Sequence, residues 1–225
     1  MNDLVAIFWV ARKDLLHETR SKATTVATLF FSAVTLVVLA FAIGQDEALL
    51  RGAATGALWV ALAFAGVISA AQSYQADLED GAFDHLLTTP VPRAAVYLGK
   101  LLANWLFMLL LGLLMLPVTF VLYGAPFPAA WPWLLATMAL GTLGFALIAV
   151  FYAGLTANLR ARESLLPVLM FPIVVPILLA AVRASGALVG PGDLDLAQGW
   201  IRLLVAFDLV YAVLCTAIYH FVVEE

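Results

Sequence analysis

The charged side chains of this sequence are concentrated between residues 75 and 100, in the stretch QADLEDGAFDHLLTTPVPRAAVYLGK. Four of the fifteen acidic residues and one histidine lie there: Asp77, Glu79, Asp80, Asp84 and His85. Apolar side chains recur between them at helical spacing and form one stripe: Leu78, Ala82, Phe83, Leu86 and Leu87. The stripe needs a surface to bury against, either the membrane face or a groove in a partner protein. We therefore predict a docking segment rather than a plain solvated loop.

A glycine and two prolines determine the expected shape of this segment. Gly81 weakens a helix by about 1 kcal/mol relative to alanine, so it marks a break or a close approach of the backbone. Pro90 and Pro92 end the element, because neither can donate a backbone hydrogen bond. We expect two short helices that meet at a bend.

The segment does not encode a nucleotide-binding loop. A P-loop requires a glycine, four residues and then Gly-Lys-Ser/Thr, so that backbone N–H groups surround the phosphates. Gly99 and Lys100 are followed by Leu101, and position 94 is alanine. Cys215 is the single cysteine, with no second thiol for a disulfide or a thiolate metal site. We predict that the chain is not an enzyme and has no catalytic residue and no metal site.

The composition assigns these residues to a membrane protein. Hydrophobic residues make up 64% of the 225 residues, charged residues only 12%, and the mean hydropathy is +1.04. The surface of a soluble domain of this size would be far more polar. The net charge of −4 includes no basic block, which argues against a nucleic-acid partner. Lipid is the expected surrounding medium.

Apolar runs of about 20 residues are needed to cross a hydrocarbon core about 30 Å thick. Six runs qualify, at residues 23–43, 53–76, 94–122, 133–156, 165–183 and 201–223. The first run is too long for the apolar part of a signal peptide, so we expect an uncleaved span. The sequence predicts an all-α integral membrane protein with six transmembrane helices, in which residues 1–225 form a single transmembrane domain.

Lysine and arginine predict the orientation, because cytoplasmic loops carry an excess of them. With the N-terminus inside, eight basic residues lie inside: Arg12, Lys13, Arg20, Lys22, Arg93, Lys100, Arg160 and Arg162. Three lie outside: Arg51, Arg183 and Arg202. We predict that both termini and a segment at residues 77–93 are cytoplasmic, and that residues 184–200 form an external loop.

Residues 1–22 are predicted to form an amphipathic helix on the membrane surface. One face of the helical wheel is apolar and comprises Leu4, Val5, Ile7, Phe8, Trp9, Ala11, Leu15 and Leu16. The other face comprises Asp3, Lys13, Asp14, His17 and Arg20. We expect a juxtamembrane anchor, with a specific contact to a partner as the alternative.

Two further features interrupt the spans. Pro167, Pro172 and Pro176 each free a backbone carbonyl in the fifth span, which predicts either a hinge or gate or a bent packing helix. Asp208 is an intramembrane charge in the sixth span. We expect it near the outer headgroups, paired with Arg183 or Arg202; the alternative is a position that faces protein or water.

Several of these strings resemble a known family. They are Asp77-Leu78-Glu79-Asp80-Gly81, Leu86-Leu87, Pro90, Lys100, Leu143-Gly144-Phe145 and the run from Leu166-Pro167 to Pro176-Ile177. The pattern resembles the permeases of type 2 ABC exporters and, more narrowly, the haem exporter B (CcmB-type) family of bacterial cytochrome c maturation. The resemblance extends over nearly the whole chain. The length and the number of spans also match this family.

The resemblance implies a multi-pass permease of the bacterial cytoplasmic (inner) membrane that docks a separate ABC ATPase. It implies a second copy of the chain, two ATPase copies, a haem-handling membrane protein, a small helper and a haem chaperone as partners, besides membrane lipid. ATP would be bound by the ATPase, and its hydrolysis would release the haem-loaded chaperone. Whether haem crosses the permease is left open by the resemblance. Because His17, His85 and His220 fall on the cytoplasmic side or at its edge, we expect haem to be bound by the partners and not by this chain.

The same resemblance gives the charged segment a role. Residues 77–87 would be the coupling helix in the ATPase groove, with Phe83, Leu86 and Leu87 as packing anchors and Glu79, Asp80 and Asp84 at the rim. Two other functions stay open. One is a type 2 ABC exporter for lipid, polysaccharide or drug, and the other is a transporter that does not use ATP. The latter predicts internal repeats and intramembrane ionisable pairs.

Overall fold

The computed structural model describes residues 3–20, 23–79, 92–157, 162–190 and 192–222. Over these residues the chain is all-helical. The helices are α1 (Asp3–Arg20), α2 (Ala23–Ile43), α3 (Glu47–Glu79), α5 (Arg93–Tyr123), α6 (Trp131–Thr156), α7 (Arg162–Val189) and α8 (Leu194–Val222). Six of the described helices, α2 to α8, are long and apolar enough to cross a membrane. The predicted all-α membrane fold with six spans is confirmed.

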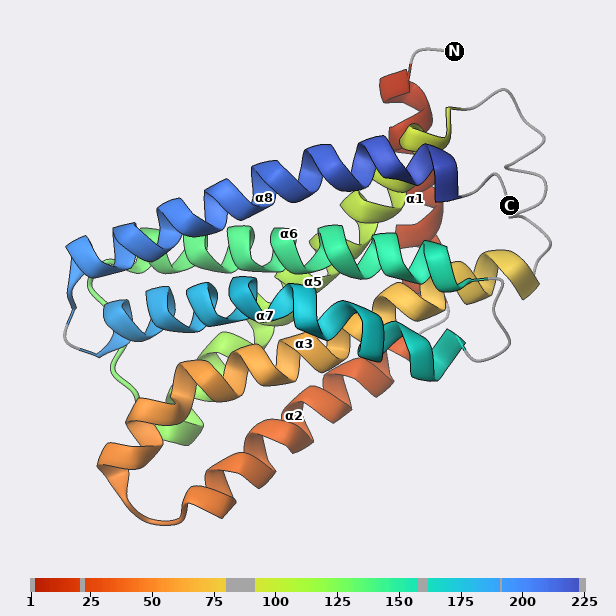
Figure 1. Cartoon of the computed structure of the whole chain (residues 1–225). Coiled ribbons are helices and arrows are strands. Elements are labelled where there is room, and N and C mark those ends of the chain that lie inside the picture. The colour runs from red at the N-terminus through yellow and green to blue at the C-terminus, as the bar shows by residue number, and fades with distance from the viewer. Residues whose placement is uncertain (1–2, 21–22, 80–91, 158–161, 191, 223–225) are drawn as a thin grey trace.

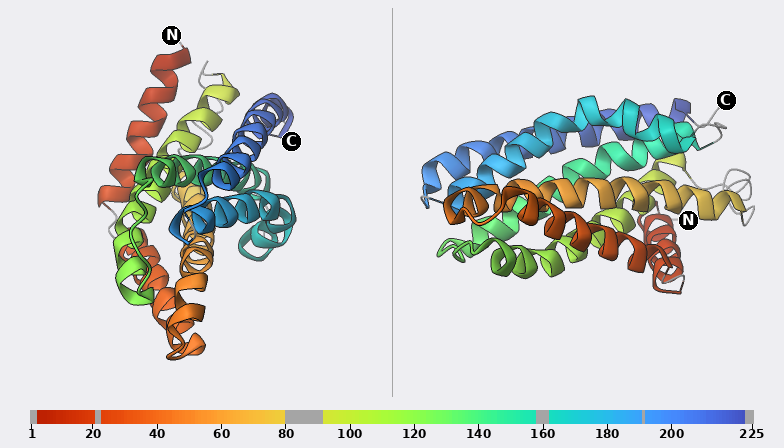
Figure 2. Two further views of the ribbon diagram at one scale, coloured as in Figure 1. Left: turned by 90° about the vertical axis from the view of Figure 1, so that its left-hand side faces the viewer. Right: turned by 90° about the horizontal axis from the view of Figure 1, so that it is seen from below.

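The six long helices run roughly side by side, and α1 lies across one end of the bundle (Figure 1). Seen along the bundle, the long helices appear end-on while α1 still appears from its side (Figure 2). The described ends of α3 and α8 lie at the same end as α1. The turns from α2 to α3, from α5 to α6 and from α7 to α8 lie at the opposite end. We call these two ends the α1 end and the far end.

Two of the helices begin earlier than hydropathy predicts, because an aspartate caps each one. At α3, the backbone N–H groups of Ala48 and Leu49 donate to Asp46 Oδ1 at 3.0 and 3.1 Å. At α8, the N–H of Leu196 donates to Asp193 Oδ1 at 3.0 Å. Each cap satisfies donors that have no partner within the helix.

The expected external loop at residues 184–200 is therefore wrong in extent. Helix α7 continues to Val189 and α8 begins at Leu194, so most of the expected loop is helical. Hydropathy falls in this region because polar residues enter, but helical hydrogen bonding continues through them. Gly192, with a φ of 70°, lies in the short turn that remains and adopts a left-handed conformation that glycine accepts without strain.

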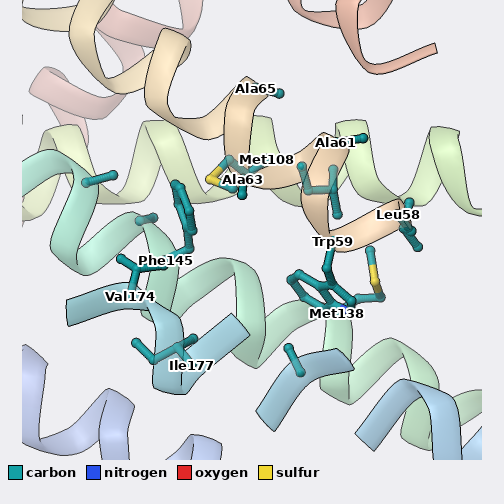
Figure 3. Packing of buried hydrophobic residues seen from close by; sticks show 14 of the residues in the cluster. Leu58, Trp59, Ala61, Ala63, Ala65, Met108, Met138, Phe145, Val174 and Ile177 are labelled. Carbon is teal, nitrogen blue, oxygen red and sulfur yellow. The ribbon is translucent and has the colours of Figure 1, made fainter. Parts of the chain in front are cut away.

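The core lies around α3 and α6, which are mostly buried, whereas α2 and α8 expose most of their surface. Figure 3 shows Trp59 of α3 beside Met138, and Phe145 of α6 near Val174 and Ile177 of α7. The indole N–H of Trp59 donates to Ser185 Oγ of α7 at 3.1 Å, so the large side chain is also fixed in orientation. These contacts join α3, α6 and α7 at the centre of the bundle.

Helix α1 packs on α5 through small residues. A Cβ added to Gly99 would lie 2.6 Å from Val10 Cβ, so the two helices approach closely only because residue 99 is glycine. Ala6 and Val10 of α1 are buried, whereas Leu4, Phe8 and Trp9 are exposed. The exposed apolar side chains are available to a lipid surface, in line with the expected anchor. The predicted polar face of α1 includes Lys13 and Asp14, which contact the bundle: Lys13 Nζ donates to Asp77 of α3, and Asp14 accepts from Lys100 of α5.

Candidate functional site

Five polar side chains from three helices meet at the α1 end of the bundle. They are Lys13 and Asp14 of α1, Ser73 and Asp77 of α3, and Lys100 of α5. We call them the α1–α3–α5 network. Ser73 and Asp77 lie four residues apart and so share one face of α3. The close packing of Val10 on Gly99 brings the next turn of α1 against them.

Lys100 is the centre of the network and its side chain is fully buried. Its Nζ lies 2.7 Å from Asp77 Oδ2 and 3.2 Å from Asp14 Oδ2. It also donates to the carbonyl oxygen and to Oγ of Ser73, each at 3.0 Å. An ammonium group has three protons and accepts none, so this shell satisfies it without water. The lysine reaches inward from the first turns of α5 and is held there by α1 and α3 together.

Lys13 completes the network from the side of α1. Its Nζ donates to Asp77 Oδ1 at 2.5 Å and lies 3.2 Å from Asp14 Oδ1. Ser73 Oγ donates to Asp14 Oδ2 at 2.9 Å. Burial lowers the pKa of the Lys13 ammonium, but the charge of Asp14 and the hydrogen bond to Asp77 outweigh burial, so the pKa is raised above its ordinary value of 10.5.

The network is electrically balanced. It contains two ammonium groups, Lys13 and Lys100, and two carboxylates, Asp14 and Asp77, so its formal charge is zero. Isolated charges at a membrane edge or in a protein interior are costly, and they persist when paired and hydrogen-bonded. Loss of any one of these four charged side chains leaves an uncompensated charge. The arrangement therefore fixes the relative positions of three helices more strictly than apolar contact would.

Tyrosines extend the network toward α6 and α8. The Nζ of Lys100 lies 4.6 Å from the centre of the Tyr74 ring, a favourable position for a cation on an aromatic face. The hydroxyls of Tyr74 and Tyr219 are 3.0 Å apart, and Tyr219 packs against Tyr97 with ring centres 5.0 Å apart. The hydroxyl of Tyr97 donates to the carbonyl oxygen of Leu147 at 2.8 Å. A continuous chain of polar and ring contacts thus links α1, α3, α5, α8 and α6.

Most of the predicted coupling residues lie outside the described residues. These are Asp80, Gly81, Phe83, Asp84, His85, Leu86 and Leu87. Glu79 is the last residue of α3, and Leu78 is half-buried against the core. Asp77 is predicted among the coupling residues, and that role stays a prediction. Its side chain is buried, because α3 continues past residue 76 and the lysines of α1 and α5 neutralise its charge.

The three prolines of the fifth span lie inside one continuous helix. Pro167, Pro172 and Pro176 all fall within α7, which runs unbroken from Arg162 to Val189. Pro172 is exposed and the other two are half-buried. A role as hinge or gate stays a prediction.

Asp208 lies deeper than expected. It is 5% exposed and makes no ion pair with Arg183 or Arg202, both of which are exposed. The pairing near the outer headgroups is wrong because α8 begins at Leu194, which moves Asp208 to the middle of the helix. The alternative, a position that faces protein, is the one observed.

Sequence reasoning did not identify the network, although one signal was available. Lys100 lies inside the predicted span 94–122, and an ionisable residue in an apolar run requires a partner. The part of the network on α1 could not be found in the same way, because Lys13 and Asp14 are 86 residues or more away from Lys100 along the chain. Only the crossing of α1 over α5 brings them together.

The fold and the network define a polytopic membrane protein whose surface helix is tied to the inner bundle by buried ion pairs. Comparison with known proteins identifies the family: the model of the CcmB protein family matches residues 5–223, and the chain belongs to this family. It is 34% identical over 172 residues to Heme exporter protein B of Paracoccus denitrificans, covering 76% of this chain and 78% of the relative. It is 33% identical over 169 residues to Heme exporter protein B of Pseudomonas aeruginosa, covering 75% and 74%. The predicted family and the predicted location, as a multi-pass protein of the bacterial inner membrane, are confirmed.

Proposed function

We propose that this chain is the permease subunit of an ABC haem exporter in cytochrome c maturation. Its family and its relatives, which carry the name Heme exporter protein B, support this role. The segment at residues 77–93 docks a separate ATPase at the cytoplasmic face. The permease itself carries out no hydrolysis, since ATP belongs to the ATPase.

One observation carries the proposal: the first residue of the docking segment is held by ion pairs to both α1 and α5. Asp77 is the first residue of the segment, and Lys100 follows its end by seven residues. The two side chains form a buried ion pair, 2.7 Å from Nζ to Oδ2. Lys13 joins the same carboxylate to α1. A force applied to the segment is therefore transmitted to α1, α3 and α5 together.

The contacts of the tyrosines give that force a route into the bundle. It leads from Lys100 through Tyr74 and Tyr219 to α8, and through Tyr97 to the backbone of α6. In the assembly, two copies of this chain act with two ATPase copies, a haem-handling membrane protein, a small helper and a haem chaperone. ATP hydrolysis releases the haem-loaded chaperone, and haem is held by the partners. Pro167, Pro172 and Pro176 allow α7 to bend in response.

The test combines a gene deletion with one variant in the docking segment. Deletion should abolish c-type cytochromes, measured by haem staining, and leave the haem chaperone attached to its loading protein. The variant Phe83→Asp places a charge among the apolar anchors, so it should reduce co-purification of the ATPase at least tenfold while the chain stays in the membrane. The matched control is Leu49→Asp, the same change at an exposed leucine of the far end.

The outcomes separate the candidate functions. Unchanged ATPase co-purification with Phe83→Asp would contradict docking through this segment. Normal c-type cytochromes in the deletion strain, together with co-purification of the ATPase with the wild-type chain, would instead indicate a type 2 exporter for another substrate.

A further inference from the structure

Asp208 is a buried ionisable side chain that the proposed function does not use. It lies 14 residues after Leu194, about 21 Å along α8 at 1.5 Å per residue, near the middle of the candidate span Leu194–Tyr219. It is 5% exposed, and both carboxylate oxygens lack a hydrogen-bond partner among the described residues. A buried, unpartnered polar group in the middle of a membrane span requires an explanation.

The carboxyl group occupies a space left by a glycine. A Cβ built on Gly144 of α6 would overlap Asp208 Oδ1, and two carbons of Ile177 lie 3.1 Å from the same point. Alanine at residue 144 would therefore displace the aspartate. The close approach of α6 and α8 at this level depends on the pair Gly144 and Asp208, with an apolar wall from α7.

No described cation faces this carboxyl group. Helix α6 contains no charged residue between Trp131 and Thr156. Arg183 of α7 and Arg202 of α8 are exposed, and Lys100 of α5 belongs to the α1–α3–α5 network. Apart from Arg93 and Asp195, which lie in the first turns of α5 and α8, the remaining titratable side chains described on these helices are tyrosines and a cysteine, which cannot supply a positive charge: Tyr97, Tyr123, Tyr152, Tyr211, Cys215 and Tyr219.

An ionised carboxylate in these surroundings is strongly unfavourable, because the group is 5% exposed and no cation on the described parts of the neighbouring helices compensates its charge. A neutral carboxylic acid loses far less on burial, and its O–H can donate to a carbonyl oxygen of a neighbouring helix turn. We propose that Asp208 is a proton-binding site of the transmembrane bundle, which holds its proton as long as α6 and α8 are packed together. Water that enters between the two helices ionises the group, so a movement that separates α6 from α8 releases a proton.

Infrared spectroscopy tests the occupancy of the site directly. The full chain is reconstituted in lipid nanodiscs at neutral pH, with and without aspartate labelled with ¹³C at the side-chain carboxyl carbon. We expect the C=O band of a protonated carboxylic acid, which shifts with the label and in D₂O. The band should be absent in Asp208→Asn and retained in Asp195→Asn, a control at an exposed aspartate of the same helix.

The conservative variant Asp208→Glu keeps the test decisive if Asp208→Asn does not fold. In this variant the acid band should no longer shift with labelled aspartate, because the protonated group is now a glutamic acid. A wild-type spectrum with only ionised-carboxylate bands would overturn the proposal. So would a labelled acid band that persists in Asp208→Glu, because it would belong to another aspartate.

Discussion

Lys100 and Asp77 form a buried ion pair across α3 and α5, with 2.7 Å between Nζ and Oδ2. The pair lies at the base of the segment between the described end of α3 and the start of α5, at Glu79 and Arg93. Lys13 adds α1 to the same carboxylate. Ion pairs thus hold α1, the end of α3 and the first turns of α5 together, so we expect them to move as one unit. Packing of apolar side chains alone would let α1 slide on α5.

Replacement of Lys100 by methionine should destabilise the bundle strongly. Lys100→Met keeps the side-chain length but leaves the carboxylates of Asp14 and Asp77 with Lys13 as their one cation in the network. Removal of one partner of a buried pair costs about 3–5 kcal/mol. Thermal unfolding in detergent should show a clearly lower Tm.

An exposed ion pair provides the control for this change. Arg51 Nη2 lies 2.9 Å from Glu47 Oε2 on the surface of α3, and such pairs contribute about 0–1 kcal/mol. Arg51→Met should therefore leave Tm nearly unchanged. The double variant Lys100→Met, Asp77→Leu should recover part of the loss, because it removes both charges. Equal Tm values for Lys100→Met and Arg51→Met would contradict the structural role of the network.

The contribution of Lys13 should be constant through neutral pH. Its pKa is raised above 10.5 in the folded protein, so its stabilisation is complete below that value and is lost as the pH rises through the folded pKa. The difference in Tm between wild type and Lys13→Met should be equal at about pH 6 and about pH 9, and it should shrink only at more alkaline pH. A difference that already disappears by about pH 9 would show that the ion pairs to Asp14 and Asp77 do not hold the proton on Lys13.

A single methyl group should separate α1 from α5. In Gly99→Ala the new Cβ would lie 2.6 Å from Val10 Cβ and 3.0 Å from the carbonyl oxygen of Ile7, so the surface helix must shift. Gly52→Ala is the matched control, because a Cβ there meets nothing within 4 Å. Both changes gain about 1 kcal/mol of helix propensity. We expect a lower Tm for Gly99→Ala than for Gly52→Ala, and equal stabilisation by both would show that α1 does not need this contact.

The spans were predictable from the sequence because each follows from a local property, the length of an apolar run. Their ends were less so, since Asp46 and Asp193 extend α3 and α8 through polar residues by capping them. Hydropathy does not detect a cap of this kind. The extent of the N-terminal helix was predictable, but the side that it buries was not. Its helical wheel has two apolar sides, of which the side around Phe8 is exposed and the side around Val10 is buried.

The site was predictable only where its residues are close in sequence. The charge of Asp77 was noted, but its burial depends on Lys100 and Lys13, which are distant along the chain. Asp208 was recognised as an intramembrane charge, yet its depth depended on a helix start that was placed at residue 201 instead of Leu194. Long-range pairing and cap position, rather than composition, were the missing information.

The orientation of the bundle can be tested with single cysteines. Eight of the eleven lysines and arginines fall on the predicted cytoplasmic side, and the helices that carry the described ones place them at the α1 end. In a Cys215→Ser background, which removes the buried native thiol, Gln45→Cys and Asp195→Cys lie at exposed positions of the far end. A membrane-impermeant maleimide added to spheroplasts should label both. Arg12→Cys on the exposed side of α1 should be labelled only after the cells are lysed. The reverse pattern would place the docking segment on the periplasmic side of the inner membrane, where a cytoplasmic ATPase could not bind it.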